Sequence, residues 1–104
     1  MIYNLNKKEN VERILTLIGR DTKDSESICK IYDLLTAWFD KHPMILDSFN
    51  ISRLNSHFRF ACLLSAVSLY EKLPTDFFKL FIPESVYKIY KFIFSYVDSD
   101  LIAA

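Results

Sequence analysis

The C-terminal third of this chain is dense in aromatic side chains. The segment from Phe77 to Tyr96 contains eight Phe or Tyr residues. One face of a helix cannot cover eight large rings, because only a stripe of its surface faces the core. We therefore expect some rings at the centre of the core and others at the surface, where they meet another protein. The eight are Phe77, Phe78, Phe81, Tyr87, Tyr90, Phe92, Phe94 and Tyr96.

The overall composition favours one helical domain. A chain of 104 residues is long enough for a single hydrophobic core, so residues 1–104 are expected to form one domain. Apolar residues make up 51% of the chain and charged residues 25%, which is ordinary for a globular protein. A single Gly argues against an all-β fold, because tight hairpin turns need residues that tolerate positive φ.

Apolar residues at helical spacing predict an all-α fold, a compact bundle of four main helices plus a short extra helix. The third main helix is expected at the centre, because Arg59 is its only charged residue between Phe58 and Tyr70. The predicted main helices are Lys7–Ile18, a second from Asp24 or Ser25 to His42, a third from about Ser52 to Lys72, and Glu84–Val97; the short extra helix is Asp76–Phe81.

Several residues predict where these helices begin and end. Asn6 followed by Glu9 is typical of a capping box, and Gly19 is placed to end the first helix in a left-handed conformation. His42-Pro43 is expected to stop the second helix, because the residue before a proline is disfavoured in the helical region. The connection Met44–Asn50 has the alternative of forming one helical turn that Pro43 starts.

The last segment also has an alternative. Residues Val86–Val97 are rich in β-branched and aromatic side chains, which are typical of a strand. The start Pro83-Glu84-Ser85 favours a helix. A lone strand in a helical domain would moreover have nothing to pair with except a second copy of the chain. We therefore predict a helix here.

Charge and cysteine content exclude several kinds of partner and cofactor. Thirteen basic and thirteen acidic residues give no net charge, which makes nucleic-acid binding unlikely and self-association easier. Cys29 and Cys62 are predicted to be buried, reduced thiols, and a disulfide would require their two helices to meet. Two Cys and two His without tight spacing do not make a zinc site. No metal or cofactor is predicted.

The sequence predicts a cytoplasmic protein. No stretch approaches the roughly 18 uninterrupted apolar residues of a membrane span. The first residues lack the order of a signal peptide, in which a charged region precedes an apolar one. The abundance of Ile, Phe, Tyr, Lys and Asn, whose codons are AT-rich, indicates a bacterial, phage or viral gene.

No pattern of residues predicts an enzyme. One Gly is too few for a glycine-rich phosphate loop, and no Ser lies in a nucleophile-elbow context. The acidic pairs, Asp21 with Asp24 and Asp98 with Asp100, lie in a linker and in the tail. Neither pair has the apolar setting that would tune a carboxyl group for acid–base catalysis.

Arg53 and His57 are four residues apart and share one face of the predicted third helix. This pair resembles the Arg and His of the HEPN family, metal-independent ribonucleases on an all-helical scaffold. That family separates its Arg and His by a longer interval than the three residues found here. The resemblance implies a helical ribonuclease or RNA-binding domain that uses Arg53 and His57, with Arg59 close by.

A second resemblance lies further along the chain. The segment Leu69-Tyr70-Glu71-Lys72-Leu73-Pro74-Thr75, followed by Phe78-Lys79, is similar to the Leu-Tyr-Asp-Lys-Ile-Pro-Ser segment of the Hha/YmoA family. Members of that family are small helical proteins that partner a nucleoid-associated silencer in enteric bacteria. The resemblance implies a transcription modulator that acts through a protein partner.

The leading interpretation is a small non-enzymatic protein–protein interaction module, such as an inhibitor, an immunity protein, a secretion chaperone or a regulator subunit. Its aromatic C-terminal helix would be the binding surface, and its partner would be another protein or a second copy in a homodimer. The residues predicted to bind the partner are Tyr87, Lys91, Phe92, Phe94 and Tyr96.

Overall fold

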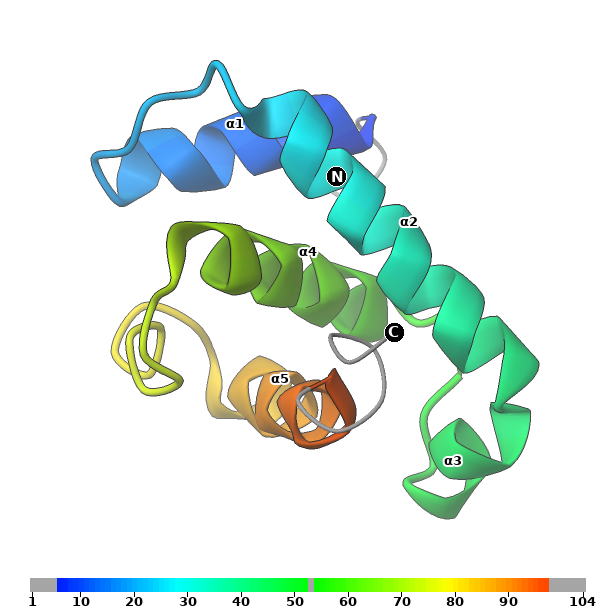
Figure 1. Cartoon of the computed structure of the whole chain (residues 1–104). Helices are drawn as coiled ribbons and strands as arrows, with labels where there is room; N and C mark the ends of the chain where they lie inside the picture. The colour runs from blue at the N-terminus through cyan, green and yellow to red at the C-terminus, as the bar shows by residue number, and fades with distance from the viewer. Residues whose placement is uncertain (1–5, 53, 98–104) are drawn as a thin grey trace.

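The computed structural model describes residues 6–52 and 54–97, which form a helical bundle without strands (Figure 1). Four main helices and one short helix in this part of the chain confirm the predicted fold class. The helices are α1 (Lys7–Leu17), α2 (Ser25–Lys41), α3 (Pro43–Ser48), α4 (Ser56–Glu71) and α5 (Glu84–Tyr96).

Helix α4 forms the centre of the bundle, as predicted. In Figure 1 it lies between α1 and α2 on one side and α5 on the other, and all three contact it. Every side chain from Ala61 to Ser68 is buried, so α4 has no polar face along this stretch. Small side chains such as Ala61 and Ala66, both fully buried, let the neighbouring helices approach closely.

Two asparagines start the helices that lead into the core. The Asn6 side chain accepts a 2.8 Å hydrogen bond from the Glu9 backbone N–H and thereby caps α1, as predicted. Asn55 caps α4 in the same way, accepting from the His57 N–H at 2.7 Å. The prediction that this helix begins near Ser52 was therefore wrong by about one turn, because Asn55 has extended backbone angles and occupies the cap position.

The ends of α1 and α2 follow the predicted signals. Gly19 has a φ of +75°, and the next residue, Arg20, donates its backbone N–H to the Leu15 carbonyl at 2.8 Å. Helix α2 stops at Lys41 before His42-Pro43. His42 is held by its own helix, since its ring stacks on Trp38 and its Nδ1 lies 2.8 Å from the Trp38 carbonyl oxygen. Pro43 then starts the short helix α3.

The predicted short helix over Asp76–Phe81 is absent. The segment instead makes separate four-residue turns, such as Lys79 N–H to the Asp76 carbonyl and Phe81 N–H to the Phe78 carbonyl. A helix this short forms too few hydrogen bonds to offset the cost of nucleation. The chain is anchored instead by Phe78, which is buried edge-on against Tyr90 with the ring centroids 5.9 Å apart.

The last segment is a helix, as predicted, and not a strand. Pro83 is its cap residue, with an extended ψ of 150°. Helix α5 packs mainly on α4. Its buried residues are Val86, Tyr90, Ile93 and Phe94; Val97, just after its end, is also buried, and Ile89 is half-buried.

Both cysteines are free and buried, which confirms the prediction of two thiols without a disulfide. Burial raises the pKa of both thiols, most strongly at Cys62 of α4, whose side chain is completely buried. A thiolate is the reactive form of cysteine, so the raised pKa makes these thiols poor nucleophiles.

Candidate functional site

Most of the C-terminal rings are at least partly covered within the single chain. Phe78, Tyr90 and Phe94 are buried, and Phe77, Tyr87, Phe92 and Tyr96 are half-buried. Phe81 alone among the eight is exposed, at 68%. The interior therefore absorbs more of these rings than the sequence pattern indicated.

Phe94 does not lie on the surface where it was predicted to bind a partner. Its side chain is only 9% exposed and packs against Tyr90, with the ring centroids 5.0 Å apart. The reason is that Tyr90 and Phe94, four residues apart, share one face of α5, and the packing of α5 on α4 turns this face inward. Phe94 is a core residue and is not part of the surface described below.

Two other predicted residues are covered by segments distant in sequence. Phe92 stacks on Phe49, which follows α3, at 4.1 Å between ring centroids. Tyr96 lies beside Trp38 and Phe39 of α2, at 5.7 and 6.2 Å. The fully exposed positions of α5 are polar: Glu84, Ser85, Lys88, Lys91 and Ser95. Most of the outer side of α5 is therefore polar and not aromatic.

Tyr87 and Lys91 remain accessible at the start of α5. Tyr87 is half-buried, and Lys91 is exposed with its Nζ 5.7 Å from the centre of the Tyr87 ring. A lysine at this distance from a tyrosine face is a weak cation–π pair. Among the predicted partner-binding residues, only Lys91 is exposed, and the Tyr87 ring lies beside it while also packing against the core.

Leu80, the most exposed large apolar side chain among the described residues, lies just before α5 and was not among the predicted site residues. Leu80 is 92% exposed, and the adjacent Phe81 stacks at 5.8 Å on the half-buried ring of Phe77. We call Phe77, Leu80 and Phe81 the apolar turn. The sequence pattern did not reveal this surface, because a helix over the segment would have placed the three residues together on one buried stripe. Pro74 and Pro83, which bracket the segment, were the signal for a non-helical excursion.

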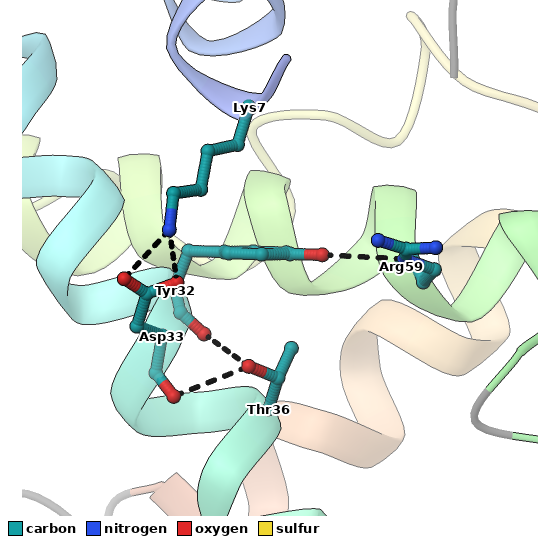
Figure 2. A network of polar contacts seen from close by, with 5 residues as sticks. All are labelled: Lys7, Tyr32, Asp33, Thr36 and Arg59. Carbon is teal, nitrogen blue, oxygen red and sulfur yellow. Dashed lines mark hydrogen bonds and ion pairs between the residues drawn. The ribbon is translucent and has the colours of Figure 1, made fainter. Parts of the chain in front are cut away.

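A cleft of about 830 Å³ opens at the other half of α4, between it, the start of α1 and the middle of α2. Figure 2 shows the polar network at its wall. Lys7 binds the carboxylate of Asp33, and the Tyr32 hydroxyl accepts a hydrogen bond from the Arg59 Nε at 3.5 Å. The cleft is lined by Asn6, Lys7, Asn10, Tyr32, Asp33, Thr36, Asp40, Leu54, Ser56, Phe58, Arg59, Phe60 and Leu63.

Tyr32 lies between the two parts of this network: it precedes Asp33 in the chain, and its hydroxyl is hydrogen-bonded to Arg59. Its side chain is only 8% exposed, yet its hydroxyl reaches the cleft at Arg59. This hydrogen bond raises the pKa of Arg59 above its already high ordinary value, so the guanidinium is always charged. At the other end, Asp33 is neutralised by Lys7. Three helices thus fix a cation, a phenol and an ion pair around one hollow.

The pair suggested by the ribonuclease resemblance lies only partly within the described residues. Arg53 lies outside the described residues, and His57 is exposed in the first turn of α4, where it does not line the cleft. That function stays a prediction. The segment that resembles the Hha/YmoA family covers the end of α4, where Lys72 adopts a left-handed conformation, and the first part of the turn segment. Its implied role is likewise untested.

Two kinds of site are absent from the described part of the chain. No three His, Cys, Asp or Glu side chains within residues 6–52 and 54–97 come together as metal ligands. Over the same residues, no helix combines the length and the apolar character that crossing a bilayer requires.

The chain was compared with protein-family profiles, with curated proteins and with solved structures, and none of the three comparisons gave a match.

Proposed function

We propose that this chain is a small non-enzymatic protein–protein interaction module that binds its partner through the apolar turn together with Tyr87 and Lys91 of α5. The observation that supports this most is the near-complete exposure of Leu80 beside the exposed ring of Phe81. Single exposed apolar side chains are common, but adjacent large ones that share a surface are typical of a contact site.

The energetics favour a contact at this turn. Covering a fully exposed Leu or Phe contributes about 1.5–3 kcal/mol each, so two such residues can act as the central anchors of an interface. Leu80 and Phe81 are not required to hold this segment on the bundle, because Phe78 already anchors it in the core. Lys91 next to Tyr87 adds a polar rim with positive charge. The partner would present an apolar pocket with an acidic edge.

The partner is another protein in this proposal, and a second copy of the chain is the alternative that the experiment distinguishes. An inhibitor, an immunity protein, a secretion chaperone or a regulator subunit would each use such a surface. We place the protein in the cytoplasm, a proposal that the two free thiols support because a reducing compartment keeps cysteines unpaired.

The proposal can be tested by introducing a photoreactive phenylalanine analogue at position 80 or 81 in cells. The matched control carries the same group at Leu17, which is 83% exposed at the end of α1. We expect the analogue at positions 80 and 81 to crosslink the same protein, and the analogue at position 17 to give no crosslink to that protein. An adduct with twice the mass of the chain would identify a homodimer.

Two results would count against the proposal. One is the same set of adducts from all three positions, which would reflect general stickiness of exposed groups. The other is an unchanged adduct from a chain that carries the analogue at position 87 and has Leu80 and Phe81 both replaced by Ser. Thermal unfolding of that double variant is the folding control, and its stability is expected within about 0.5 kcal/mol of the wild type because both side chains are exposed.

A further inference from the structure

The cleft between α1, α2 and α4 presents hydrogen-bond donors that no described residue uses. Arg59 donates only its Nε, to Tyr32, and none of the carboxylates among the described residues forms an ion pair with it. A guanidinium has five N–H donors, so its terminal nitrogens remain available. The Tyr32 hydroxyl accepts from Arg59, and its own proton has no acceptor within the described parts of the chain.

These donors sit in a place suited to recognition. Tyr32 is held rigidly because its ring is buried, and its hydroxyl fixes the orientation of the guanidinium (Figure 2). The Ser56 hydroxyl lies one turn earlier on α4 and lines the same cleft. A volume of about 830 Å³ is within the range of ligand pockets. Arg59 is exposed at the wall of this hollow, so its donors are accessible to a ligand that supplies acceptor oxygens.

The charges of the described side chains that line the cleft favour a ligand with a single negative charge. Asp33 is neutralised by both contacts with Lys7, and Asp40 farther along α2 makes a contact of its own. Lys7, Arg59, Asp33 and Asp40 sum to zero, so the cleft offers no broad positive field to a doubly charged phosphate. A carboxylate matches the planar fork of an arginine and can accept two parallel hydrogen bonds from it.

We propose that this cleft binds a carboxylate carried on an apolar body, with the carboxylate at Arg59 and the Tyr32 hydroxyl. Phe60 and Leu63, on the same wall of α4, contact the apolar body. The same chemistry is found in a free apolar acid and in the C-terminal carboxylate of a peptide. This site is separate from the apolar turn, which follows the opposite end of α4, and it does not depend on the interaction proposed there.

Titrations followed by backbone amide NMR can test the proposal and separate the two sources. The probes are 3-phenylpropionate with its uncharged amide, and a short peptide ending in Phe with either a free or an amidated C-terminus. We expect the acids to shift resonances around Tyr32 and Arg59, and the amides to bind about ten- to a hundredfold more weakly. Binding by only the free acid, or only the peptide, identifies the source.

The variant Arg59→Gln should lose the preference for the acid, and Tyr32→Phe should weaken it while keeping the ring in the core. Arg13→Gln is the matched control, because Arg13 is an exposed arginine of α1 that does not line the cleft. Thermal unfolding checks that each variant folds. Equal binding of acid and amide, retention of the preference in Arg59→Gln, or no shift up to roughly 10 mM ligand would each overturn the proposal.

Discussion

The hydroxyl groups of Ser68 on α4 and Tyr90 on α5 lie 2.8 Å apart, inside the apolar interface between the two helices. Both side chains are almost completely buried. Each hydroxyl satisfies the other, which avoids the cost of an unpaired polar group in the core. Because only one register of α5 on α4 brings the two together, this hydrogen bond also selects how the helices pack.

The first prediction concerns this pair. Tyr90→Phe leaves the Ser68 hydroxyl without its partner, and we expect the free energy of unfolding to fall by about 1–2 kcal/mol. Ser68→Ala should cost a similar amount for the same reason. The double variant should lose less than the sum, because no hydroxyl is then left unpaired. Urea unfolding of the four proteins measures this, and strictly additive losses would contradict the coupling.

The second prediction is a loss of stability at alkaline pH. Burial raises the pKa of the Cys62 thiol, and it raises the pKa of Tyr90 even though the Ser68 hydrogen bond opposes the shift. The folded chain therefore keeps both groups neutral, while the unfolded chain ionises them near 9.0 and 10.0. Stability from these groups is complete below pH 9 and is lost as the pH rises above it, by up to about 1.4 kcal/mol per pH unit for each.

Cys62→Ala tests which group causes the first part of this decline. The variant should make the fall in stability between pH 9 and pH 10 shallower, since Cys62 is the more strongly shifted of the two thiols, while Cys29 and Tyr90 still contribute. Urea unfolding at a series of pH values provides the comparison. A variant that loses stability as steeply as the wild type over this interval would show that Cys62 is not buried as described.

The third prediction separates core rings from surface rings. Phe94→Ala should reduce the free energy of unfolding by about 3–4 kcal/mol, because a buried ring is removed and a cavity remains. Phe81→Ala should change it by less than about 0.5 kcal/mol. Chemical unfolding of both variants measures the difference. Similar small effects at the two positions would place Phe94 at the surface, as its sequence position first indicated.

The fourth prediction concerns Gly19. A side chain at this position would meet no atom within 4 Å, so any cost of substitution comes from the backbone alone. With φ at +75°, Gly19→Ala should destabilise the chain by about 1 kcal/mol, and Gly19→Asn by less, because Asn tolerates the left-handed region better. Thermal unfolding gives the ranking, and a neutral alanine variant would contradict it.

Local patterns in the sequence were sufficient to predict the four main helices, the Asn6 cap and the left-handed Gly19. They were not sufficient where two local solutions compete. Ser52 and Asn55 are both good cap residues, and the choice depends on how the chain enters from α3, where Asn50 is left-handed and Ile51 is buried. The helix predicted over residues 76–81 does not form for a similar reason. Burial of Phe78 outweighs the weak tendency of such a short segment to be helical.

The candidate sites depend on contacts between distant segments, which a one-dimensional pattern does not contain. Phe49 covers Phe92 from more than forty positions away, so a stripe analysis of α5 alone overestimates its exposed rings. In the cleft, Lys7 meets Asp33 and Arg59 meets Tyr32 across separations of 26 and 27 residues. Only the packing of three helices reveals that these side chains share one hollow.

The burial of α4 among the other helices also determines how the chain unfolds. Because α1, α2 and α5 each bury apolar surface against the same central helix, removing any one of them exposes part of it to water. No subset of helices retains a complete interior, so denaturation should proceed as a single cooperative step. The backbone amides from Ala61 to Ser68 are then expected to exchange with deuterium only when the whole molecule opens.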